Sequence, residues 1–221
     1  MAPLSSLCYF HRAVNRSCAR HKLGYVKMKK TIIGLMLMLV TAFSVNAQQK
    51  TAAELKAERE QIAAELKSKD VVKRQDKLVK LNDKAANVKQ TGLGSIDGLA
   101  ETSTSVLKTV MSTNEVLKQY RVEMTDNGNG EVEIAKYAAN LDDYVKLAGD
   151  LAQAAVLAAD GAKKLESAKD DVKKLSPLQA KPALSSISFS TDALSLSADE
   201  IALQTRIATN LIESIKASKN L

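Results

Sequence analysis

Residues 184–215 read LSSISFSTDALSLSADEIALQTRIATNLIESI, and the period of this stretch decides the fold class. Its first half alternates polar and apolar residues, as in Ser186-Ile187-Ser188-Phe189-Ser190 and again around Leu194. Such alternation is typical of two β-strands, and Thr191-Asp192-Ala193 would supply the turn of a hairpin. The competing interpretation is a helix, because one series of mostly apolar residues runs through the whole stretch without a change of phase.

The helical series takes its members at alternating spacings of three and four residues across five heptads. Because a switch from strand to helix would have no reason to preserve the phase, we predict a helix from Ala183 to about Lys216. Ser197-Ala198-Asp199-Glu200 matches a capping box, so a break at that point is the main alternative within the helix. The series consists of Leu184, Ile187, Thr191, Leu194, Ala198, Ile201, Thr205, Ala208, Ile212 and Ile215.

Three further helical segments precede this one, separated by short stretches that contain Gly or Pro. Segment 51–90 opens with the capping box Thr51-Ala52-Ala53-Glu54, and its apolar stripe slips in phase near Ser68-Lys69-Asp70, where we expect a stutter or bend. Segment 95–124 repeats its apolar residues every 3.5 positions. Segment 131–175 carries two apolar seams, one of them rich in Ala, which predicts that it packs on two sides and is the best buried of the four.

These four segments and their short connections predict an all-α fold. We expect residues 48–221 to form one domain, an elongated antiparallel up-down-up-down four-helix bundle with coiled-coil-like heptad packing.

Residues 28–47 have the layout of a secretory signal peptide, with Met28-Lys29-Lys30, an apolar run, and small residues up to Ala47. The run from Ile32 to Val45 is 14 residues long, too short for a transmembrane helix. We therefore expect cleavage after Ala47 and export to the periplasm or the medium. Residues 1–27 are basic and free of Asp and Glu, which also fits a transit peptide. We favour the interpretation that translation starts at Met28 and that residues 1–27 come from a wrongly assigned start codon.

Removal of residues 1–47 changes the chemistry of the chain. The full sequence has 32 basic and 25 acidic residues, and this leader holds seven of the basic ones and none of the acidic ones. The mature chain is therefore electroneutral, which removes the argument for a nucleic-acid partner. Residues 48–221 also contain no Cys and no His, so the common ligands for zinc, copper and haem are missing. We expect no cofactor, no metal site and no catalytic residues.

Several short motifs have a functional and a structural interpretation, and we favour the structural one for each. Ser105-Val106-Leu107-Lys108 matches S-x-x-K but lacks the companion motifs of penicillin-binding enzymes. Gly92-Leu93-Gly94 reads as a turn in which Gly92 ends the first helix in a left-handed conformation. The loop from Asp126 to Glu131 is rich in oxygen ligands, yet it fails the EF-hand pattern.

We also expect the acidic pairs and the tyrosines to have structural and not catalytic or ligand-binding roles. The side chains of Asp142-Asp143 and of Asp170-Asp171 point about 100° apart on a helix, so neither pair forms an acid dyad. Tyr137 and Tyr144 lie one heptad apart, which favours core packing over ligand stacking.

The sequence favours an exported, non-enzymatic helical-bundle protein with a structural or protein-interaction role in the bacterial envelope. Its partner is an unknown protein or a second copy of the chain, because a two-sided helix exposes more apolar surface than four helices can cover.

The alternative is a membrane-active or lipid-binding bundle, whose shape resembles helical pore-forming toxins of the cytolysin A type. That resemblance is architectural and rests on no motif. The longest uncharged run of the third segment, Leu151 to Ala159, is too short to span a bilayer.

Overall fold

The computed structural model describes residues 50–126 and 130–219, and every regular element in these two ranges is helical. The all-α prediction is therefore confirmed for them, and the hairpin interpretation of residues 184–197 is wrong. The expected signal peptide 28–47 and the extension 1–27 lie outside the described residues. The elements in chain order are α2 (Ala52–Leu66), α3 (Lys69–Ala85), α4 (Gly94–Asp126), the 3-10 helix η1 (Ile134–Asn140), α5 (Leu141–Val172) and α6 (Pro177–Lys219).

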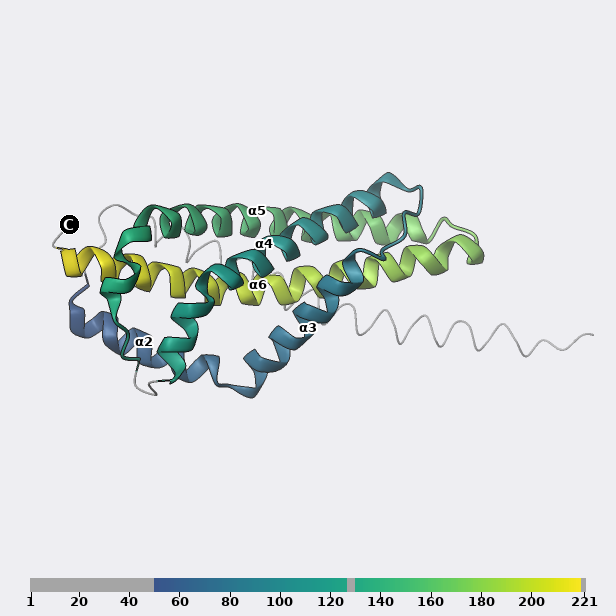
Figure 1. The fold of residues 1–221 in the computed structure, drawn as a ribbon. Coiled ribbons are helices and arrows are strands. Elements are labelled where there is room, and N and C mark those ends of the chain that lie inside the picture. Colours follow the sequence, from purple (N-terminus) through teal and green to yellow (C-terminus); the bar gives the residue numbers. More distant parts are fainter. Residues whose placement is uncertain (1–49, 127–129, 220–221) are drawn as a thin grey trace, which may run out of the picture.

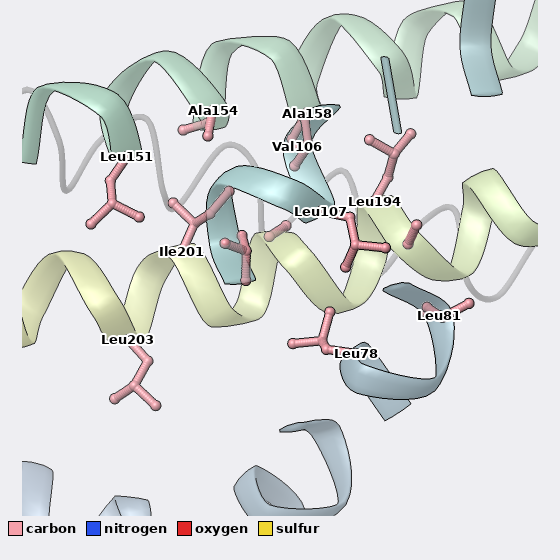
Figure 2. Packing of buried hydrophobic residues seen from close by; sticks show 14 of the residues in the cluster. Leu78, Leu81, Val106, Leu107, Leu151, Ala154, Ala158, Leu194, Ile201 and Leu203 are labelled. Atoms are coloured by element: carbon pink, nitrogen blue, oxygen red, sulfur yellow. The ribbon is translucent and has the colours of Figure 1, made fainter. Parts of the chain in front are cut away.

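Three long helices, α4, α5 and α6, pack against one another, and α2 and α3 lie along α6 and α4 (Figure 1). The four residues between α5 and α6 force the two helices to run antiparallel. Side chains from all three long helices meet in the core. Figure 2 shows Leu151, Ala154 and Ala158 of α5 above α6, and Leu78 of α3 on its opposite side.

The first predicted helix is two helices, because the bend expected near Ser68 is a complete break. Ser68 adopts an extended backbone conformation, and its Oγ accepts a hydrogen bond from the Val71 N–H at 3.3 Å, which caps α3. The capping box at Thr51 is confirmed. The Glu54 N–H donates to Thr51 Oγ1 at 3.3 Å, and the Thr51 N–H donates to the Glu54 carboxylate at 2.7 Å.

Residues 134–140, predicted as the start of the third helix, form the separate 3-10 helix η1. Glu123 of α4 explains this difference, because it binds the segment by long-range contacts. Its carboxylate accepts hydrogen bonds from the Glu133 N–H at 3.1 Å and from the Tyr137 hydroxyl at 2.7 Å. These contacts fix the path of the chain before α5 begins at Leu141.

The best-buried helix is α6, so the assignment of that role to the third segment is wrong. Of its 43 residues, 20 are buried, against 13 of 32 in α5. The helix contacts α2, α3, α4, α5 and η1, and so lies at the centre of the fold. No break occurs at Ser197–Glu200, because Ser197 is fully buried and the Glu200 carboxylate binds arginines of other helices instead of capping.

Gly130 lies where the chain returns from α4 and passes close to α2. Its φ is +69°, and a Cβ atom there would lie 2.8 Å from the backbone nitrogen of Glu60. Both the left-handed conformation and the close approach require glycine. Gly92 has a similar φ of +76°, but a Cβ atom there would meet nothing within 4 Å.

We therefore predict that Gly130→Ala lowers the free energy of unfolding by roughly 2–3 kcal/mol, from backbone strain and the collision with α2 together. Gly92→Ala is the matched control, and backbone strain alone should cost about 1 kcal/mol there. Urea denaturation of the two variants measures both values. Equal losses would show that the approach of Gly130 to α2 is not tight.

Candidate functional site

Buried polar side chains line α6 on the sides that face α2, α3 and α4. We call this set the polar seam. Each member is at most 5% exposed, although the surrounding core is apolar. Buried polar groups are stable only when they are hydrogen-bonded, so the partners of the seam decide what it can do. Its members are Ser186, Ser190, Ser197, Glu200, Gln204, Asn210 and Ser214.

Glu200 is the charged centre of the polar seam and is 1% exposed. Its Oε2 accepts from Arg74 Nε of α3 at 3.0 Å, and its Oε1 accepts from Arg121 Nη1 of α4 at 3.1 Å. Arg121 also donates to Asn114, and Gln75 lies at 3.5 Å from Glu200 Oε1. One buried carboxylate thus joins three helices, and two guanidinium groups compensate its charge.

Gln204 and Asn210 continue the seam with hydrogen bonds of their amide groups, and Asn210 Nδ2 also donates to the Glu58 carboxylate at 2.9 Å. Gln204 Nε2 donates to the Val110 carbonyl at 3.1 Å, and its Oε1 accepts from the Thr113 hydroxyl. Asn210 Oδ1 accepts from the Tyr120 hydroxyl at 3.1 Å, and Asn210 Nδ2 donates to the Leu55 carbonyl at 3.0 Å. Burial raises the pKa of Tyr120, which keeps its hydroxyl protonated as a donor.

Two arginines tie α2 and α6 together near the far end of the seam. Arg59 is 9% exposed; its Nε donates to the Gly130 carbonyl at 3.2 Å and its Nη1 to Ser214 Oγ at 2.7 Å. Arg206 of α6 donates to the Glu65 carboxylate at 2.6 Å. Each of these contacts joins one particular pair of residues, so together they fix the position of α2 along α6.

A tyrosine cluster lies beside η1. The rings of Tyr120 and Tyr137 pack edge to face at 5.2 Å, and Tyr144 lies 6.3 Å from Tyr137. Tyr137 and Tyr144 are 4% and 6% exposed, which confirms their prediction as core residues. Burial acts to raise the pKa of Glu123, but hydrogen bonds from Tyr137, the Glu133 N–H and Lys136 outweigh it and lower that pKa.

A groove of about 400 Å³ lies between the end of α3 and the first half of α4. Ala85, Val88 and Ala100 provide apolar lining, and the Ser105 and Lys108 of the S-x-x-K match also line it. Ser105 and Lys108 are exposed, as expected for a solvated helix face.

The other sequence motifs are structural where they are described. Gly92 adopts the predicted left-handed conformation, but α3 ends at Ala85, so Gly92 belongs to the linker before α4 and ends no helix. Asp170 and Asp171 pair with Lys173 and Lys174 at 2.7 and 2.9 Å. The possible calcium loop 126–131 includes residues 127–129, which lie outside the described residues.

In the described ranges, no group of three or more His, Cys, Asp or Glu side chains is placed to hold a metal ion. Within those same ranges, no helix is both long enough and apolar enough to cross a membrane.

Comparison with known proteins finds no similarity to draw on. No protein-family model matches the chain, and no curated protein and no solved structure matches it either.

Sequence reasoning missed the polar seam, although a signal for it is present. Ser186, Ser190, Ser197, Glu200 and Gln204 lie at intervals of four, seven, three and four residues, which is the same helical period as the apolar series beside them. Polar residues at helical period usually indicate a solvated face. Glu200 and Gln204 are buried here because α3 and α4 supply matching donors and acceptors, and Ser186 donates to the Lys89 carbonyl of the linker. Ser190 and Ser197 are buried without a hydrogen-bond partner.

Asp97 anchors the linker that joins α3 to α4. Its Oδ1 accepts from the Thr91 N–H at 2.7 Å and from the Thr91 hydroxyl at 2.8 Å, while Oδ2 accepts from the Gly92 N–H at 2.9 Å. Burial acts to raise the pKa of Asp97, but these hydrogen bonds outweigh it and lower the pKa below 3.8.

We predict that Asp97→Asn lowers the free energy of unfolding by about 1–2 kcal/mol at neutral pH, because charge-assisted bonds to the linker are lost. The stabilisation by Asp97 is fully present above pH 3.8 and is lost as the pH falls through its lowered folded-state pKa. The difference between the two proteins should therefore shrink in acid. Urea denaturation at pH 7 and pH 2.5 tests this, and a difference that stays constant would contradict it. Exposed Asp142→Asn is the control.

Proposed function

We propose that residues 48–221 are an exported, non-enzymatic helical-bundle protein with a structural or protein-interaction role in the bacterial envelope. In this proposal the helices run up, down, up and down, with α2 and α3 together in the first position, and they pack with heptad spacing. Support comes from the short connection between α5 and α6 and from the 3,4 spacing of the buried residues Leu194, Ala198 and Ile201.

The observation that carries the non-enzymatic part is the pairing of Glu200. It is a deeply buried carboxylate, the kind of group that catalysis often uses, yet Arg74 and Arg121 both bind it and α3 and α4 cover it. A general acid or base must reach a reacting atom within hydrogen-bond distance. A carboxylate fully engaged between two arginines holds helices together instead.

The interaction part of the proposal draws on the outer face of α5. Val145 and Val156 are 46% and 51% exposed, and Gly149 and Ala152 lie between them at helical spacing. This line of small apolar residues would let a partner helix approach closely. Photo-crosslinking from position 156 in the native host, compared with position 166 on another face of α5, tests whether a partner contacts this line.

Export is tested by sequencing the mature N-terminus of protein isolated from the native host. We expect Gln48 as the first residue and recovery from the envelope or the medium. A mature terminus upstream of Met28 would contradict the proposal.

A liposome assay tests the membrane-active alternative. Leakage of dye from phosphatidylglycerol-containing liposomes on addition of the purified protein would favour that alternative over the structural or protein-interaction role.

A further inference from the structure

The α2–α3 pair is attached to the rest of the fold differently from the three long helices. We call residues 50–85 the arm, and α4, η1, α5 and α6 the body. The arm carries ten basic and seven acidic residues, whereas the body, residues 94–219, carries 14 and 18. The arm therefore has a net charge of +3 and the body a net charge of −4. This charge complementarity favours the binding of an arm to a body over the binding of two arms or of two bodies to each other.

Polar contacts between arm and body lie along the C-terminal half of α6, from Glu200 to Ser214. They join Arg59 to Ser214, the Leu55 carbonyl to Asn210, Glu65 to Arg206, and Arg74 to Glu200. A foreign helix on the same surface would leave Glu200 buried with one arginine fewer, which is costly. The polar seam is thus selective for an arm of this sequence, in this register.

The closed arrangement also leaves some buried polar atoms without a partner. In the part of the chain that the structure describes, Arg74 Nη2, Ser190 Oγ and Ser197 Oγ are buried and form no hydrogen bond. Arg74 belongs to the arm, and its Nη2 would gain a water partner when the arm lifts away, which lowers the cost of opening. The body keeps its apolar contacts among α4, α5 and α6 during that motion.

A single linker, residues 86–93, joins the arm to the body, and a swing of the arm needs rotation only there. Gly92 gives this linker conformational freedom, and Asp97 holds it in the closed path. An arm that opens on such a hinge can close on any body that presents the same seam.

We propose that the arm exchanges between two copies of this chain, so that the arm of each copy packs on the polar seam of the other. The surface under the arm is therefore an interaction surface whose partner is a second copy. Domain swapping of this kind reuses contacts that already exist in the monomer, and the interface is complementary without new side chains. This inference is independent of where the protein acts and of the proposed interaction role of α5.

The test replaces residues 86–93 with the helix-forming sequence EAAAKEAA, which joins α3 and α4 into one stiff helix and prevents the arm from folding back. We expect this variant to have the mass of a dimer by light scattering, with the ordered helix content of the wild type. A monomer with a protease-sensitive arm would overturn the proposal.

Adding Glu200→Gln to the linker variant should raise the dissociation constant of the dimer by roughly 100-fold. Adding the exposed Glu115→Gln should leave it unchanged.

The wild type provides the second measurement, because it keeps its own linker. Two preparations with different affinity tags are mixed at high concentration, and particles that carry both tags are quantified over time. We expect mixed dimers, and they should form faster at high salt, because screening weakens the charge attraction that keeps each arm closed on its own body. A wild-type protein that forms no mixed particles at any concentration would overturn the exchange.

Discussion

Replacing Glu200 with alanine is expected to lower the free energy of unfolding by roughly 3–5 kcal/mol, because it leaves two guanidinium groups poorly compensated in the interior. Arg74 and Arg121 are only 14% and 10% exposed at their side chains. The exposed pair of Glu115 and Lys118 is the control, since both side chains are 65% exposed and Glu115→Ala should cost less than 1 kcal/mol. Urea denaturation followed by circular dichroism measures both.

The same site allows a sharper test of its role. Replacing Glu200, Arg74 and Arg121 together with apolar residues of similar volume should recover most of the lost stability, because no buried charge remains. The triple variant should also lose the selectivity of the seam for its arm. If the triple variant is as unstable as Glu200→Ala, then lost packing, and not an uncompensated charge, explains the single variant.

The second large effect is expected for Leu151→Asp in α5. Leu151 is 0% exposed and packs in the core with residues of α6 (Figure 2). The substitution removes an apolar side chain and buries a carboxylate without a partner, so the loss should reach roughly 4–5 kcal/mol or more. Val156 of the same helix is 51% exposed, and Val156→Asp should change stability by less than about 0.5 kcal/mol. Similar losses for both variants would mean that α5 does not pack on this face.

Periodicity predicts the long helices well, because they bury a repeating apolar face. The series from Ile187 to Ile215 keeps its phase, and the structure has one helix there. The phase slip near Ser68 predicts the position of the boundary between α2 and α3 correctly. The pattern indicates only a stutter or bend there, whereas the structure has a complete break between two helices. The local capping signal at Ser197–Glu200 misleads because tertiary partners bind Glu200 more strongly than a helix end would.

Features that depend on distant partners were not predictable from the pattern. The path of residues 134–140 follows from hydrogen bonds to Glu123, which lies in another helix. The central place of α6 follows from groups on α2, α3 and α4 that bind its Glu200, Gln204, Asn210 and Ser214 side chains. Sequence period gives the spacing of these residues but does not say whether water or protein covers them.

Native-state hydrogen exchange tests the central claim, that a cationic arm closes on a separate body through the polar seam of α6. The account predicts that amides of α2 and α3, such as those of Ile62 and Leu78, exchange through an opening that costs less free energy than global unfolding. Amides of Leu151 and Leu194 in the body should exchange only through global unfolding. Equal opening free energies in arm and body would show one cooperative unit and would contradict the account.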